Sequence, residues 1–182
     1  DGLTAIMALV IWQKDFRAAT ADDWKRGAIC GILFGLGGAL QTMGLELINT
    51  GVNAFISAAY VVIVPFMVWI IEKSKPAGKV FISAAIAMAG VTIMSITGIT
   101  SGEFSMGKGE MLSLMSAFCY AGAIVTADCF TRKTSVSLIT GMQFIFAFAV
   151  ALIMALTLGE PLPSFDIVST PIVIEFIYLI IF

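Results

Sequence analysis

The sequence predicts an all-α, polytopic membrane protein, and three observations lead to this prediction. The chain of 182 residues is 59% apolar and only 12% charged, whereas a soluble domain carries about 25% charged residues. Uncharged runs of about 18 residues or more, which are long enough to cross a bilayer, recur along the chain. Nine of the ten Lys and Arg residues fall in every second gap between these runs. Because Lys and Arg gather on the cytoplasmic side, this alternation indicates that every run spans the membrane.

The alternation also predicts the orientation of the chain. The gaps 14–26, 72–79 and 128–133 hold nine basic residues and are therefore expected to face the cytoplasm. Only Lys108 lies in a gap of the other group. We accordingly expect a multi-pass protein of the plasma or inner membrane. The basic residues of the three gaps are Lys14, Arg17, Lys25, Arg26, Lys73, Lys75, Lys79, Arg132 and Lys133.

Composition limits the chemistry that the chain can perform. It has no His, which removes His-based acid–base catalysis, His proton relays and His metal ligands. Its three Cys lack metal-ligand spacing and are interpreted as small apolar packing residues. No basic patch indicates a nucleic-acid surface. We therefore expect no catalytic residue, no metal, no cofactor and no nucleic-acid partner.

Seven apolar runs follow one another along the chain. The first, at 2–13, is short and is expected to be the second half of a helix that ends in the cytoplasm. The last, at 171–182, re-enters the membrane after an outer loop at 160–163. Since neither end has a hydrophilic flank or a signal peptide, the sequence indicates a fragment cut within two spans. Five complete spans are predicted at 27–45, within 47–71, within 80–102, at 111–127 and within 134–159.

The first complete span carries a start signal and a ridge of small residues. Thr20 is followed three residues later by Asp23, which is the spacing of a capping box and predicts a helix start. Gly27, Gly31 and Gly35 then recur at every fourth residue. In lipid, this spacing lets two helix backbones approach closely. Close helix packing is the first interpretation, and a flexible gating helix is the alternative.

Two features interrupt the predicted helices. Pro65 lies inside the span within 47–71 and is expected to kink the helix or to free a carbonyl. The stretch 98–109 is rich in Gly and poor in apolar residues, and we interpret 99–108 as an outer-side linker between two halves. The predicted units are therefore 1–98 and 109–182.

Function is expected where polar side chains persist inside the apolar runs, because burying them in hydrocarbon is costly. Asn53, Ser57 and Tyr60 follow at i, i+4 and i+7 and share one helical face. We expect such faces to line a polar cavity near the midplane in which a small solute binds. The alternative is interhelical hydrogen bonding, which averages about 0.6 kcal/mol per pair in membranes. The predicted solute-binding residues are Gln41, Asn53, Ser57, Tyr60, Ser116, Tyr120 and Gln143.

The carboxylates give weaker signals. Glu175 lies five residues into the last run, where it is either a carboxylate that couples transport to protons or a helix-start residue. The other carboxylates near the membrane are interpreted as solvated loop ends. They are Glu46, Glu103, Glu110 and Glu160 on the outer side and Asp128 on the inner side.

Several segments of the chain resemble EamA-type drug/metabolite transporters. The stretches 41–45 and 53–65, the second with its Tyr and Pro, resemble the third and fourth helices of that family. The segment 109–132 is similar to the opening helix of the second half of the family. That helix usually begins with Gly-Asp, and Glu110 replaces the Asp here. Gln143-Phe144 and Gly159-Glu160-Pro161 also fit the helix that follows.

The resemblance covers helices two to eight of ten, and it implies a ten-helix fold of two inverted five-helix repeats. The present chain would hold five complete spans and two partial ones: 1–98 from the first repeat and 109–182 from the second. Inverted repeats place the solute site at their interface near the midplane. The resemblance therefore implies alternating access, commonly with efflux of amino acids, other metabolites or toxic compounds.

The sequence favours a secondary transporter of a small organic solute over two alternatives. A non-catalytic membrane subunit is the first alternative. An intramembrane lipid-modifying enzyme is the second, and the lack of His and of clustered carboxylates in the spans disfavours it. The lipid bilayer and a small organic solute are the expected partners. A coupling proton, an exchanged second solute and a homodimer are left open.

Overall fold

The computed structural model describes residues 2–73, 77–99 and 107–158. The expected outer loop at 160–163, the last run and Glu175 lie outside the described residues. Every regular element in the described part of the chain is a helix, so the all-α prediction is confirmed. The helices are α1 (Gly2–Ile11), α2 (Gln13–Arg17), α3 (Ala21–Leu45), α4 (Thr50–Ser57), α5 (Tyr60–Glu72), α6 (Gly78–Ile99), α7 (Lys108–Thr131) and α8 (Val136–Leu158).

Four of the described segments are long and apolar enough to cross a membrane: Ala21–Leu45, Thr50–Ile71, Lys108–Thr131 and Val136–Leu158. α6 has 22 residues, and at 1.5 Å per residue its length of about 33 Å also matches a hydrocarbon core of about 30 Å. The chain is therefore a multi-pass membrane protein, as predicted.

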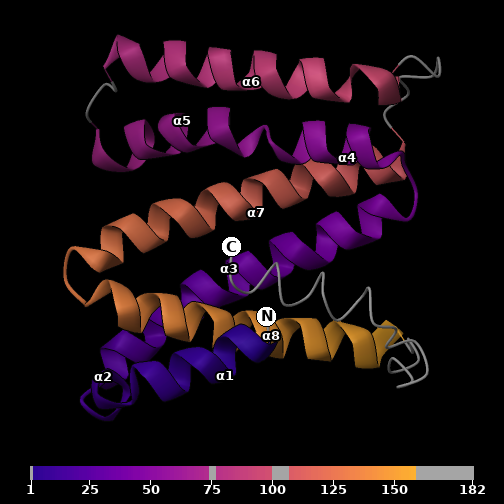
Figure 1. Cartoon of the computed structure of the whole chain (residues 1–182). Coiled ribbons are helices and arrows are strands. Elements are labelled where there is room, and N and C mark those ends of the chain that lie inside the picture. Colours follow the sequence, from indigo (N-terminus) through magenta and orange to yellow (C-terminus); the bar gives the residue numbers. More distant parts are fainter. Residues whose placement is uncertain (1, 74–76, 100–106, 159–182) are drawn as a thin grey trace.

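The long helices run alternately in opposite directions, and the basic gaps collect at one end of the bundle (Figure 1). α2, the ends of α5 and α7 and the starts of α3, α6 and α8 lie at this end, on the left of the view. We call it the basic end. Lys108, the first residue of α7, lies at the opposite end. This arrangement agrees with the predicted alternation of Lys and Arg.

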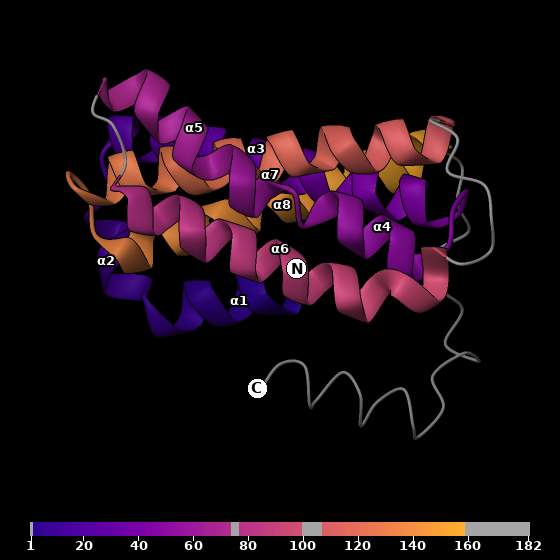
Figure 2. The ribbon, with the colours of Figure 1, turned by 90° about the horizontal axis from the view of Figure 1, so that it is seen from above.

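The helices lie side by side as a layered bundle. Across the view of Figure 1 the order is α6, the α4–α5 pair, α7, α3, α8 and α1, and Figure 2 shows the same bundle from above. α3 packs most extensively against α7 and α8. Helices that the sequence assigns to different halves therefore share the centre of the bundle.

The Gly ridge of α3 packs directly against α8. A Cβ atom at Gly27 would collide with Met142, and one at Gly31 would collide with Phe146 and the backbone of Gln143. At Gly35 the nearest atom would be Val150 Cβ, at 2.9 Å. Of the two interpretations of this ridge, close helix packing is the one that the structure shows.

The span that contains Pro65 is divided into two helices. α4 ends at Ser57 and α5 begins at Tyr60, while Pro65 lies inside α5. The amides of Val61 and Val62 bond to carbonyls only three residues earlier, at 3.0 and 2.9 Å. Pro65 has no N–H to bond the carbonyl of Val61. The interruption thus lies N-terminal to the proline, about two turns before it, where the helical bonds tighten.

Polar bonds join the start of α3 to the loop between α7 and α8 at the basic end. Thr134 Oγ donates to Asp23 Oδ1 at 2.7 Å, and Arg26 Nη1 donates to Thr134 Oγ at 2.9 Å. Arg26 also pairs with Asp23 at 3.7 Å. Asp23 and Thr20 form the predicted capping box, which is confirmed. We call Asp23, Arg26 and Thr134 the basic-end clamp.

Replacing Thr134 by valine should open this clamp. Cys30 lies one turn after Arg26, is fully buried and has its Sγ 3.5 Å from Thr126 Oγ. Loss of the two bonds made by Thr134 should increase local opening. Cys30 should then react with a membrane-permeant maleimide about threefold to tenfold faster, in a background in which Cys119 and Cys129 are alanine.

Thr131→Val is the matched control, because the Thr131 hydroxyl donates to Asp128 O within its own helix, at 3.1 Å, and to no other group among the described residues. Equal reaction rates for Thr134→Val, Thr131→Val and the parent protein would show that the clamp does not hold this end closed.

Candidate functional site

Six of the seven predicted solute-binding residues meet where three segments pack together. Gln41 comes from α3, Ser116 and Tyr120 come from α7, and the others come from the interrupted α4–α5 segment. The face of α4 that carries Asn53 and Ser57 lies against α7. Their i, i+4 spacing predicts a shared face but not the helix that it contacts. We call this set the polar network; it comprises Gln41, Asn53, Ser57, Tyr60, Ser116 and Tyr120.

Hydrogen bonds run through most of the polar network. Gln41 receives two of them: the Tyr120 hydroxyl donates to its Oε1 and Asn53 Nδ2 donates to its backbone O, both at 2.9 Å. Ser57 Oγ donates to Asn53 Oδ1 at 3.4 Å and lies 3.3 Å from Ser116 Oγ. These bonds connect α4 both to α3 and to α7.

The polar network has a buried part and a more accessible part. Asn53, Ser57 and Ser116 are at most 4% exposed, and every buried side-chain polar atom in the described residues has a partner. Gln41, Tyr60 and Tyr120 are partly exposed. For the two serines the structure shows interhelical hydrogen bonding. A role of the network in solute binding stays a prediction.

Gln143 lies apart from the polar network. It is on α8, and its backbone packs against Gly31 of α3. Gly31 precedes Gln41 by ten residues on the same helix, a separation of about 15 Å. The structure therefore does not bring Gln143 together with the other six residues. Glu175 falls outside the described residues.

An aromatic series borders the polar network. The rings of Tyr60 and Tyr120 are 6.2 Å apart, Tyr120 and Phe34 are 5.5 Å apart, and Phe34 and Phe144 are 6.0 Å apart. All three pairs meet edge to face, a preferred arrangement for aromatic rings. Phe34 lies two turns before Gln41 on α3, so the aromatic rings and the polar groups follow the same face of that helix.

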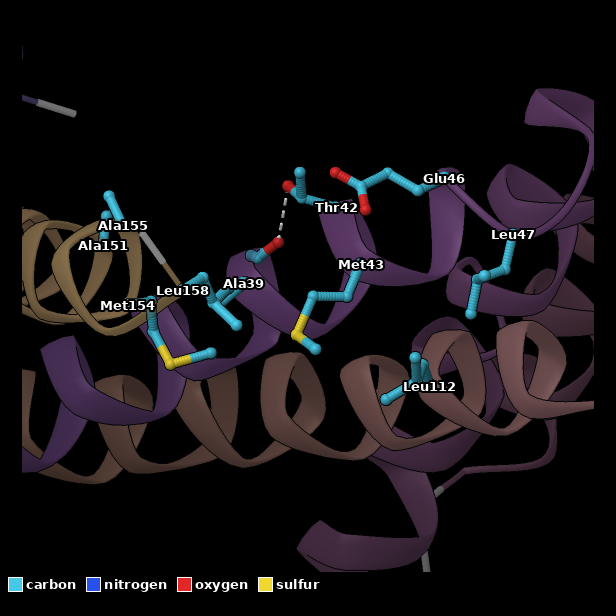
Figure 3. Close-up of a pocket in the computed structure, with 12 residues that line it drawn as sticks. Ala39, Thr42, Met43, Glu46, Leu47, Leu112, Ala151, Met154, Ala155 and Leu158 are labelled. Atoms are coloured by element: carbon cyan, nitrogen blue, oxygen red, sulfur yellow. Dashed lines mark hydrogen bonds between the residues drawn. The ribbon is translucent and has the colours of Figure 1, made fainter. Parts of the chain in front are cut away.

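A cavity of about 620 Å³ lies between α3, α7 and α8 toward the opposite end (Figure 3). Small residues of α3 and α8 form part of its wall. Its larger lining side chains include Thr42, Met43, Glu46, Leu112, Met154 and Leu158. This cavity was not among the predictions made from the sequence. We call it the outer cavity because it lies toward the end of the bundle opposite the basic end. Glu46 was expected only as a solvated loop end; it is exposed, and it also lines the cavity.

A second hollow of about 280 Å³ lies on the α4 side of α3 and is lined by Gln41, Thr42 and Asn53 among others. Thr42 lines both spaces. The polar network therefore lies next to the outer cavity across a single turn of α3. Gly38, Thr42 and Glu46 recur at every fourth residue and share one helical face, but this spacing alone does not indicate a cavity.

The chemistry of this region is hydrogen bonding by neutral groups with one carboxylate nearby. Amides, hydroxyls and phenols supply both donors and acceptors. The described residues contain no group of three or more Cys, Asp or Glu side chains that could hold a metal ion. Groups of this kind can hold a small molecule by hydrogen bonds.

Comparison with models of protein families gives a match. The model of the EamA-like transporter family matches residues 2–96, just over half of the chain. No curated protein and no solved structure matches the chain.

Proposed function

The chain belongs to the EamA-like transporter family, and we propose that it is a secondary transporter that exports a small organic solute by alternating access. Members of this family are membrane transporters and not enzymes. The solute would be a metabolite, an amino acid or a drug-like compound. The transporter would lie in the plasma or inner membrane with its basic end in the cytoplasm, because Lys and Arg favour that side.

The polar network is the observation that carries this proposal. Gln41, Asn53 and Ser57 belong to the predicted first repeat, and Ser116 and Tyr120 belong to the second. Solute sites of inverted-repeat transporters lie at the repeat interface, often beside an interrupted helix. The α4–α5 interruption at Ala58 and Ala59 directly follows Ser57. The network and the interruption therefore combine two features that favour a solute site.

The outer cavity supports the same proposal. With the basic end in the cytoplasm, this cavity would face the outside, and its rim residues Glu46, Leu47 and Leu158 are exposed. The basic-end clamp joins α3 to the α7–α8 loop on the other side of the membrane. A cavity that is accessible from the outside, together with helices that are hydrogen-bonded at the cytoplasmic end, would correspond to the outward-facing state that alternating access requires.

The first test is solute counterflow. The full-length protein is reconstituted into liposomes loaded with one member of a metabolite panel, and uptake of the labelled compound is followed. We expect at least one small organic solute to be exchanged above the level of empty liposomes. Absence of exchange for every class of solute would contradict the proposed function and would favour a non-catalytic membrane subunit.

Tyr60→Phe tests the site itself. The Tyr60 hydroxyl has no hydrogen-bond partner in the described part of the chain, so its removal should leave the fold unchanged. A hydroxyl that bonds the solute contributes about 0.5–1.5 kcal/mol, so transport should fall about threefold to tenfold. Counterflow and thermal unfolding are measured together. Unchanged transport of every exchanged solute would remove Tyr60 from the site.

A further inference from the structure

Glu46 gives the outer cavity a negative mouth. Among the described residues that line this cavity, it is the only charged one. The ion pairs seen among the described residues join Lys25 with Asp22, Arg26 with Asp23 and Arg132 with Asp128, all at the basic end. Within the described ranges, Glu46 has no ion-pair partner. Its carboxylate is therefore available to a charge that enters the cavity.

The helix that carries Glu46 adds to this negative potential. Glu46 is the C-cap residue of α3, and the C-terminal end of a helix carries a partial negative charge that favours cations and disfavours carboxylates. A carboxylate at this place lowers the stability of the helix end. The same combination of carboxylate and helix end attracts a positive charge.

Apart from Thr42, whose hydroxyl donates to Gly38 O at 3.0 Å, the other described side chains that line the cavity are apolar. Figure 3 shows Met43 on α3, Met154 on α8 and Leu112 on α7 among the side chains that line the cavity. Methionine side chains are flexible and polarisable, so they adapt to apolar groups of different shape. The volume of about 620 Å³ lies within the range of pockets that hold drug-sized molecules.

We propose that the outer cavity binds a lipophilic organic cation, with its charge at Glu46 and its apolar body against Met43, Leu112 and Met154. This inference rests on the proposed transport function and specifies the class of solute. A neutral lipid chain could also fill an apolar space. It would gain nothing from Glu46, and this difference decides the test.

The test compares two probes of the same shape and different charge. Benzyltrimethylammonium is permanently cationic, and neopentylbenzene is its neutral carbon isostere. Binding to the purified full-length protein is measured by equilibrium dialysis at low ionic strength, because salt screens exposed charges. We expect the cation to bind at least about tenfold more tightly than the isostere.

Glu46→Gln should remove this preference, since it keeps the size and hydrogen-bonding capacity of the side chain and removes its charge. Glu110→Gln is the matched control: Glu110 lies in the first turn of α7 at the same end, but it does not line the cavity. This variant should keep the preference. Circular dichroism should show the same helix content in both variants.

Two results would overturn the inference. The first is equal binding of the two probes, which would make the cavity a site for neutral apolar molecules such as lipid chains. The second is a charge preference that persists in Glu46→Gln. Either result leaves the proposed transport function intact if counterflow of another solute is seen. Absence of counterflow for all solutes would instead contradict that function, whatever the probes do.

Discussion

Replacing Gly31 by leucine is expected to separate α3 from α8 and to prevent the native packing of the bundle. A Cβ atom at Gly31 would collide with Phe146 Cβ and would lie 2.7 Å from the backbone oxygen of Gln143. The Phe146 side chain cannot relieve this clash by rotating, because its own Cβ is in contact. Overpacking costs about 1–3 kcal/mol in a core that can adjust, and here the helix backbones themselves must move apart.

The measurement is the melting temperature of the purified protein in detergent, together with its elution profile in size-exclusion chromatography. We expect Gly31→Leu to aggregate or to melt far below the parent protein. Gly90→Leu is the matched control, because Gly90 lies within α6 and a Cβ there meets no atom of the described residues within 4 Å. It should leave the melting temperature unchanged or raise it, since leucine favours helix more than glycine does. Native-like melting of Gly31→Leu would show that the α3–α8 contact is not tight in the protein.

Much of this fold could be predicted because the membrane restricts the choices of the chain. Backbone groups in lipid must bond within their own segment, so each long apolar run could only be a helix. The Lys and Arg alternation then determined which helix ends lie together. The glycine spacing on α3 predicted a close contact, but the sequence could not identify α8 as its partner. That choice depends on packing between helices that are more than 100 residues apart in the chain.

The candidate site was predictable to the extent that helical periodicity determines it. Asn53 and Ser57 share a helix face, and a polar face in an apolar run is expected to have polar partners. The structure supplies Ser116 and the Gln41 backbone as these partners, which the sequence did not specify. Gln143 belongs to the same class of residue, but helix packing places it elsewhere. The outer cavity was missed because an exposed Glu at a helix end is indistinguishable from an ordinary loop residue until the neighbouring helices are in place.

A role of Asn53 in solute binding can be distinguished from its role in helix packing, because the two roles predict different losses of transport relative to stability. Asn53 is 2% exposed, and its side chain bonds both the Gln41 backbone and Ser57. Interhelical bonds in membranes average about 0.6 kcal/mol and reach about 1.7. Asn53→Ala should therefore cost about 1–3 kcal/mol of stability, which lowers the melting temperature by several degrees but leaves most of the protein folded.

Transport should respond more strongly than stability if Asn53 also serves the solute. Asn53 lines the smaller hollow together with Gln41 and Thr42. Its loss also removes the donor to the backbone O of Gln41, whose side-chain Oε1 accepts from the Tyr120 hydroxyl. Leaving a polar solute group unpaired costs about 1–3 kcal/mol. We therefore expect kcat/KM for a solute with hydrogen-bonding groups to fall by about tenfold to a hundredfold. Counterflow per folded molecule is the appropriate measurement.

Ser113→Ala provides the comparison that makes this prediction decisive. Ser113 is fully buried on α7, and its hydroxyl donates within its own helix to Gly109 O at 2.9 Å. It does not line either the hollow or the outer cavity. Its removal should lower stability with little effect on transport per folded molecule. If Asn53→Ala and Ser113→Ala reduce transport alike, in proportion to their loss of stability and equally for all solutes, then Asn53 only holds α4 against α3. A selective loss in Asn53→Ala, larger for solutes with more hydrogen-bonding groups, would instead place the amide in contact with the solute.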